Sequence, residues 1–109
     1  AYIEVKQVTL KEEDGHGYFP DSVSVRGTKH LHSLRLLAEQ GERAVLLFCV
    51  AHEGIADVAA AAHIDATYAA ALSEAAASGV EVLAYGIVVE REQGTPTGVR
   101  LARQLSVRL

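Results

Sequence analysis

The residue types best suited to chemistry are a glutamate and a lysine two positions apart in the first apolar segment, residues 2–10 (YIEVKQVTL). This segment predicts a β-strand, in which side chains two positions apart project from one face, about 7 Å apart along the strand. Glu4 and Lys6 can therefore converge on one ligand. A carboxylate binds a hard cation, an ammonium group holds an anion beside it, and acid-x-lysine is half of the pattern of metal-dependent nucleases.

The same alternation has a second interpretation, in which Glu4 and Lys6 form the solvated face of a half-buried strand whose other face carries Ile3 and Val5. A surface ion pair of this kind contributes about 0–1 kcal/mol. The two interpretations differ in where the pair lies. If a helix covers the Glu4 face, both charges are desolvated at a considerable cost, and a functional reason for them is expected.

The elements that must position these side chains follow from periodicity and are expected at residues 2–10 (strand), about 22–39 (helix), 44–51 (strand), 66–78 (helix), 80–90 (strand) and 99–109 (strand). Asp21 and Asp65 are the expected N-caps of the two helices, which Gly41 and Gly79 end. Gly27, inside the first helix, predicts a close approach of another segment.

The order of these elements predicts an α/β fold in which a mixed β-sheet is flanked by helices. Residues 44–51 are uniformly apolar, so this strand is expected to be buried on both faces at the centre of the sheet. Residues 94–98 predict a turn, and the strand after it is expected to carry Leu101, Leu105 and Val107 on one apolar face.

Length and composition limit the class of protein. The 109 residues, half of them hydrophobic, make one domain that can bury a core without disulfides. The longest purely apolar run, residues 44–51, is far shorter than the roughly 20 residues of a membrane-spanning helix, so no membrane segment is expected. Cys49 is the single cysteine and is expected to be a buried small hydrophobe in a reducing compartment, which indicates the cytoplasm. Because the chain opens on Ala1 inside a predicted strand, a fragment of a longer protein is expected.

The net charge of -4 is unevenly distributed. Residues 44–90 contain six acidic and no basic side chains, whereas residues 22–38 contain no acidic side chain and include Arg26 and Lys29. On the predicted helix Arg26, Lys29 and Ser33 form a polar stripe, with His30 at its edge. A helix packed across the sheet would bring this stripe to phosphates engaged by the strand, although a solvated helix face is the simpler alternative.

Several segments of the chain resemble the sugar fermentation stimulation protein family of bacteria and archaea. These segments are residues 2–10 (YIEVKQVTL), 17–31 (GYFPDSVSVRGTKHL), 43–48 (RAVLLF), 63–65 (HID) and 79–85 (GVEVLAY). The resemblance spans nearly the whole chain, and residues 19–31 are its most distinctive block. It implies a fold like the PD-(D/E)xK restriction-endonuclease-like core, truncated at the N-terminus. Residues 1–109 would then be a single C-terminal nuclease-like domain, with an upstream OB-like domain and the first strands outside this chain.

The resemblance also implies a site. Glu4 matches the second acid of the nuclease-like pattern, Lys6 matches its lysine, and the backbone carbonyl of Val5 would be a further ligand of Mg²⁺ or Mn²⁺. The first acid belongs to a preceding strand that this chain lacks. Pro20-Asp21 does not supply it, because this pair follows Glu-x-Lys in the chain. The shared block places Arg26, Lys29 and His30 near the site, where they would contact DNA.

Three functions remain open at this point. The first is a DNA-binding protein with a nuclease-like metal site, linked by the family resemblance to transcription regulation of sugar (maltose-type) metabolism. The second is a Mg²⁺-dependent DNA phosphodiesterase, or nuclease, in the full-length protein. The third, motivated by the family's name alone, is a small-ligand-binding regulatory domain. A homo-oligomer is compatible with each of them.

Overall fold

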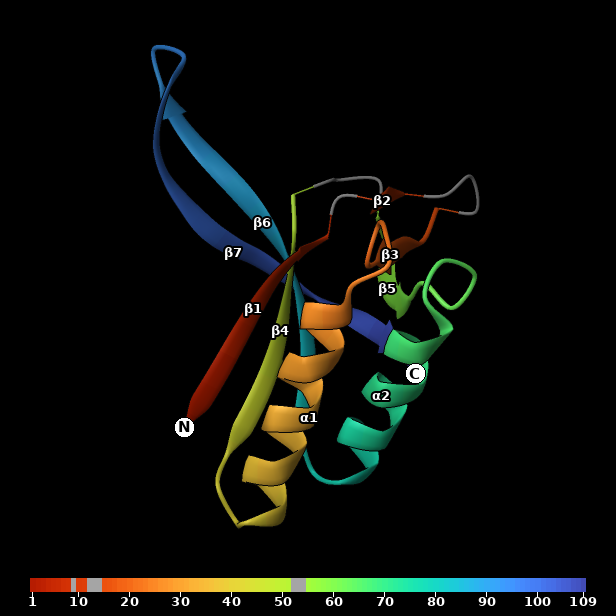
Figure 1. Cartoon of the computed structure of the whole chain (residues 1–109). Helices are drawn as coiled ribbons and strands as arrows, with labels where there is room; N and C mark the ends of the chain where they lie inside the picture. Colours follow the sequence, from red (N-terminus) through yellow and green to blue (C-terminus); the bar gives the residue numbers. More distant parts are fainter. Residues whose placement is uncertain (9, 12–14, 52–54) are drawn as a thin grey trace.

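The computed structural model describes residues 1–8, 10–11, 15–51 and 55–109. These residues form a seven-stranded mixed sheet and two helices, so the predicted α/β fold is confirmed (Figure 1). The elements are β1 (Tyr2–Val8), β2 (Leu10–Lys11), β3 (Gly17–Phe19), α1 (Val25–Glu39), β4 (Ala44–Val50), β5 (Asp57–Ala60), α2 (Ala66–Ala77), β6 (Glu81–Glu92) and β7 (Thr95–Arg108).

The strand order is β1-β4-β6-β7-β5-β3-β2, which puts β1 at one end of the order. β4 pairs in parallel with β1 and β6, while β6 and β7 form an antiparallel hairpin that extends away from the helices (Figure 1). The two helices lie side by side, with α1 against β4 and α2 next to β5. No helix in the described part of the chain is long and apolar enough to cross a bilayer.

The core lies between the helices and one face of β4, to which that strand contributes Leu46, Phe48 and Val50. Its helical members include Leu31, Leu34, Tyr68, Leu72 and Ala75. The opposite face of β4 is less covered than predicted, because no helix packs there and Leu47 and Cys49 remain partly accessible. Burial still raises the pKa of the Cys49 thiol.

The N-terminal ends of the two helices are joined by one carboxylate. Asp65 caps α2, as predicted, by accepting a hydrogen bond from the Tyr68 N–H at 3.0 Å, and its other oxygen accepts one from the Ser24 N–H at 2.8 Å. The prediction that Asp21 caps α1 is wrong, because Ser24 caps it by accepting a hydrogen bond from the Gly27 N–H at 2.9 Å. β-branched Val23 favours extended backbone and delays the start of the helix.

Gly27 is a point of close approach between the two helices, as its position in the sequence predicted. A Cβ atom built there would lie 2.6 Å from Ser24 Oγ and 3.1 Å from Cε2 of Tyr68. Any side chain at this position would therefore push α1 away from α2.

Two predictions about β7 are wrong. The turn lies at Gln93 and Gly94, both with positive φ, so the strand already begins at Thr95. The register with β6 then shifts at Ala102, which leaves Leu101 exposed while Leu105 is buried. An extra residue in one strand of a pair reverses the faces beyond it, so the alternating sequence does not make one apolar face.

Candidate metal and phosphate site

The orientation of β1 is the first property of the site that the sequence left open. β1 pairs with β4 so that Glu4 lies opposite Leu46 and Lys6 opposite Phe48. Paired residues share a face, and this face of β4 is the one packed against the helices. Ile3 and Val5 project from the other face and are 61% and 55% exposed. The polar side chains of β1 thus lie on the face of the sheet against which the helices pack.

Three polar groups converge where β1 faces α1. Lys6 Nζ lies 3.5 Å from Glu4 Oε1, and His30 Nδ1 lies 3.2 Å from the same oxygen. Lys6 Nζ and His30 Nδ1 are 2.9 Å apart, within hydrogen-bond distance. The Lys6 side chain is 15% exposed and the Glu4 side chain 37% exposed, so the carboxylate is the more open of the two. The arrangement is a half-buried carboxylate flanked by two nitrogen groups, one on the strand and one on the helix.

Helix geometry explains which of the predicted DNA-binding residues reach this site. His30 follows buried Gly27 by three residues and precedes buried Leu31 and Leu34, so it lies at the border of the packed face of α1. Arg26 lies one turn before His30 on the same side of the helix and is exposed. Lys29 is displaced around the helix and lines a cavity with Ser24, with Asp65 at the N-cap of α2 and with Thr67. His30 thus contacts Glu4 and Lys6, and Arg26 lies beside His30 on the helix surface. Lys29 lies apart from this group.

The donor set fits part of a divalent-cation site. Glu4 offers one partly open carboxylate, and no group of three or more His, Cys, Asp or Glu side chains suited to a metal occurs among the described residues. Mg²⁺ and similar cations are commonly held by one or two carboxylates, with water and substrate phosphate oxygens completing the shell. β1 is at the end of the strand order, so it also has backbone groups that β4 does not use. The carbonyl of Val5 as a ligand stays a prediction.

A buried tyrosine behind the site was not singled out as functional by the sequence. Tyr68 was expected in the core, and it is fully buried, but its hydroxyl has no hydrogen-bond partner in the described structure. Burial raises the pKa of this hydroxyl, and the carboxylates of Asp65 and Glu4 raise it further. The signal in the sequence is a tyrosine, in place of a wholly apolar residue, on the buried face of an alanine-rich helix.

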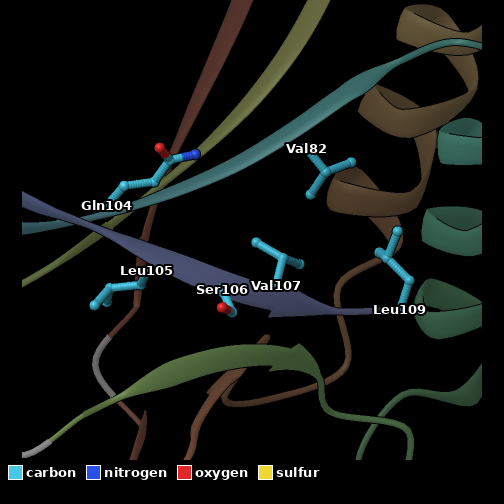
Figure 2. Close-up of a pocket in the computed structure, with 6 residues that line it drawn as sticks. All are labelled: Val82, Gln104, Leu105, Ser106, Val107 and Leu109. Carbon is cyan, nitrogen blue, oxygen red and sulfur yellow. The ribbon is translucent and has the colours of Figure 1, made fainter.

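A second cavity, of ≈ 480 Å³, lies along the end of β7 (Figure 2). Figure 2 shows its lining residues, which are Val82, Gln104, Leu105, Ser106, Val107 and Leu109. None of these side chains is ionisable, and Gln104 and Ser106 are the polar ones. The strands that form this cavity differ from the strand that carries Glu4. The cavity does not test the prediction of a small-ligand-binding role, which stays a prediction.

Comparison with known proteins identifies the family. Residues 1–93 match the family model described as the sugar fermentation stimulation protein RE domain. The chain belongs to the sugar fermentation stimulation protein family. The resemblance noted in the sequence is therefore confirmed over most of the chain.

Similar members of this family come from several bacteria. The chain is 59% identical over 110 residues to a sugar fermentation stimulation protein homolog of Chromohalobacter salexigens, covering 100% of this chain and 44% of that relative. It is 60% identical over 87 residues to the homolog of Saccharophagus degradans, covering 80% of this chain and 37% of the relative. The chain thus spans less than half the length of these relatives.

A solved structure of the family shares the fold. The structure of Pyrococcus furiosus SfsA in complex with Ca²⁺ has a TM-score of 0.85 to this chain at 30% sequence identity. The match covers 98% of this chain and 44% of that chain. The whole curled sheet with its two helices is therefore a shared feature of the two family members.

Proposed function

We propose that this chain binds the phosphodiester backbone of DNA through a divalent-cation site built on Glu4. The observation that carries the proposal is the convergence of Glu4, Lys6 and His30 on the helix-packed face of β1. A carboxylate gathered with two nitrogen groups in a partly buried position is typical of functional sites. Glu4 would be the cation ligand of this chain, with Lys6, His30 and Arg26 facing the phosphates.

The identity of the cation follows from the chemistry of the ligand. A carboxylate oxygen favours hard cations, so Mg²⁺ or Mn²⁺ is the proposed cofactor. The Ca²⁺ bound by Pyrococcus furiosus SfsA belongs to the same class of oxygen-seeking cation and supports this assignment. A cation at Glu4 would compete with Lys6 for the carboxylate, which leaves the lysine ammonium available to a phosphate oxygen.

The proposed biological setting comes from the family and not from the site. The family's description links it to the stimulation of sugar fermentation. We propose that DNA binding by the full-length protein regulates genes of sugar (maltose-type) metabolism in the cytoplasm.

The binding proposal is tested by fluorescence anisotropy of a labelled DNA duplex, titrated with protein in EDTA and in Mn²⁺. The wild-type protein is expected to bind at least about tenfold more tightly with Mn²⁺, and Glu4→Gln is expected to lose this gain. Glu39→Gln is the matched control, because it removes the same charge from the far end of α1. Equal Mn²⁺ dependence in wild type and Glu4→Gln would contradict the proposal.

A second candidate function is hydrolysis of the phosphodiester by the full-length protein. It is favoured by the position of Lys6, whose ammonium lies 3.5 Å from the proposed cation ligand and is largely shielded from solvent. A bound cation would supply Lewis-acid polarisation of the phosphate. Lys6 would orient a water molecule or neutralise charge on the phosphate oxygens.

The two candidate functions differ in whether the protein cleaves the DNA that it binds. Supercoiled DNA is incubated with wild type, Glu4→Gln and Lys6→Met in Mg²⁺ or Mn²⁺, and nicking is followed on a gel. Hydrolysis predicts cleavage by the wild type and its loss in both variants. No cleavage by any of the three proteins, with Mn²⁺-dependent binding retained, would remove the hydrolytic candidate and leave the binding function.

A further inference from the structure

The hydroxyl of Tyr68 is the polar atom of the core that the proposed function does not yet use. Tyr68 is 0% exposed, and its hydroxyl has no hydrogen-bond partner among the described residues. Buried tyrosine hydroxyls normally find a partner, because an unsatisfied polar group loses its hydrogen bond to water without replacement. A phenylalanine would fill the same space without this cost, so the hydroxyl requires an explanation of its own.

The contacts of the ring place it next to the turn of α1 that leads to His30. Its Cε2 atom is 3.1 Å from where a Cβ of Gly27 would lie, one helical turn before His30. Its ring also packs against Phe19 at 5.4 Å, and Phe19 packs in turn against Phe48 at 5.6 Å. Phe48 is the strand partner of Lys6. The ring thus lies between α1 and Phe19, and Phe19 in turn contacts the strand pair that carries the site.

The electrostatic surroundings of the hydroxyl agree with this placement. Burial is the main cause of its raised pKa, and the negative charges of Asp65 and Glu4 add to it. A hydroxyl with a raised pKa keeps its proton, so it remains a hydrogen-bond donor across the physiological pH range. Asp65 already accepts hydrogen bonds from two backbone N–H groups. Among the described residues, Lys6 and His30 both contact the Oε1 atom of Glu4, so within this part of the chain its other oxygen is the acceptor still to be assigned.

We propose that Tyr68 is a positioning residue for Glu4, donating a hydrogen bond from its hydroxyl to the second carboxylate oxygen when Glu4 binds a divalent cation. This role rests on the proposed cation site. Hydrogen bonds to a ligating carboxylate fix its orientation, and removing such a partner typically weakens metal binding about 10-fold to 100-fold. The same hydroxyl is unsatisfied in the cation-free protein, so it lowers stability until the cation binds.

The proposal predicts two opposite effects of Tyr68→Phe, which removes the hydroxyl and keeps the ring. The melting temperature of the cation-free protein is expected to rise, because an unsatisfied buried group is removed. The dissociation constant for Mn²⁺ is expected to increase about 10-fold, because Glu4 loses its orienting donor. If the hydroxyl instead made a purely structural hydrogen bond, Tyr68→Phe would lower the melting temperature and leave the Mn²⁺ dissociation constant unchanged.

The experiment combines scanning calorimetry of the cation-free proteins with isothermal titration of Mn²⁺. Tyr85→Phe is the matched control, because Tyr85 lies on β6 opposite Cys49, on the face of the sheet away from the helices, and should leave the Mn²⁺ dissociation constant unchanged. Mn²⁺ binding by Tyr68→Phe equal to wild type, or a lowered melting temperature, would overturn the role of Tyr68 alone. Absence of Mn²⁺ binding by the wild-type protein would overturn the proposed cation site, and the role of Tyr68 with it.

Discussion

At the level of single residues, the Nδ1 atom of His30 lies within reach of two groups that need different protonation states of it. An unprotonated Nδ1 accepts a hydrogen bond from Lys6 Nζ at 2.9 Å, whereas a protonated Nδ1 donates to Glu4 Oε1 at 3.2 Å. The three side chains can therefore exchange partners without movement of the backbone. This adaptability suits a carboxylate that must release its nitrogen neighbours when it binds a cation.

Asp65 is the residue whose charge contributes most directly to the arrangement of the helices. Backbone hydrogen bonds, first from Ser24 and then from Tyr68, lower the pKa of its carboxyl below the ordinary value of 3.8. These bonds favour the charged form, and the folded state alone provides them. Because the pKa is lowered in the folded state, the stabilisation is present above pH 3.8 and is lost as the pH falls below it.

We expect Asp65→Ala to lower the melting temperature at neutral pH, since two helix N-termini lose their shared acceptor. The difference from wild type should shrink as the pH falls below 3.8, where the wild-type carboxylate becomes protonated. Thermal unfolding followed by circular dichroism between neutral and acidic pH measures both effects. Asp21→Ala is the control, because Asp21 is exposed and does not cap α1. A pH-independent difference between wild type and Asp65→Ala would contradict this account.

At the level of elements, β1 has an unusual distribution of side chains. Its exposed face carries Ile3 and Val5, and its helix-packed face carries Glu4, Lys6 and Val8. Val8 is buried at the end of the strand and belongs to the core, so it anchors the polar part of the same face. The strand is therefore held by one apolar contact while the two charged residues before it remain in the partly open site.

This orientation predicts different costs for two identical substitutions in one strand. Val8→Ala should destabilise the fold by about 1–3 kcal/mol, because it leaves a cavity in the core. Val5→Ala should change stability by about 0.5 kcal/mol or less, because the side chain projects into solvent. Urea denaturation of the two variants measures the difference. A larger effect at Val5 than at Val8 would mean that the faces of β1 are assigned the wrong way round.

At the level of the whole molecule, the charge distribution must be reconciled with a polyanionic ligand. The net charge of the chain is -4, so long-range attraction of this chain to DNA is weak, and the proposed binding would depend on local cationic groups and on the proposed divalent cation. Arg26 is the exposed cation on the same side of α1 as His30, whereas Arg35 further along the helix is committed to ion pairs with Glu39 and Glu74. The two arginines therefore differ in their availability to phosphates.

We expect Arg26→Ala to weaken DNA binding and to reduce the slope of log affinity against log salt by about 1, the contribution of one phosphate contact. Arg35→Ala should leave the slope unchanged, because its guanidinium is paired within the protein. Anisotropy titrations over a series of NaCl concentrations in constant Mn²⁺ measure both slopes. An unchanged slope in Arg26→Ala would remove this residue from the proposed phosphate contacts.

Much of the fold could be predicted because its signals are local. The N-cap at Asp65 and the two-residue period that puts Glu4 and Lys6 on one face depend on neighbouring backbone alone. Gly27 signalled a close approach by its residue type, although the segment that approaches it, at Tyr68 of α2, is distant in the chain. The errors arose where local signals compete. Ser24 replaced Asp21 as the cap of α1, and one extra residue in β7 reversed the face of Leu101.

The direction in which Glu4 and Lys6 point could not be predicted in the same way. Alternation makes them share a face, but which face is covered depends on pairing with β4 and on the docking of α1, both distant in the chain. The contact of His30 with Glu4 has the same non-local origin, as has the burial of the Tyr68 hydroxyl without a partner among the described residues. Strand period is a property of the backbone at each residue, whereas burial arises from packing between segments, and so the site became visible when the sheet and helices were assembled.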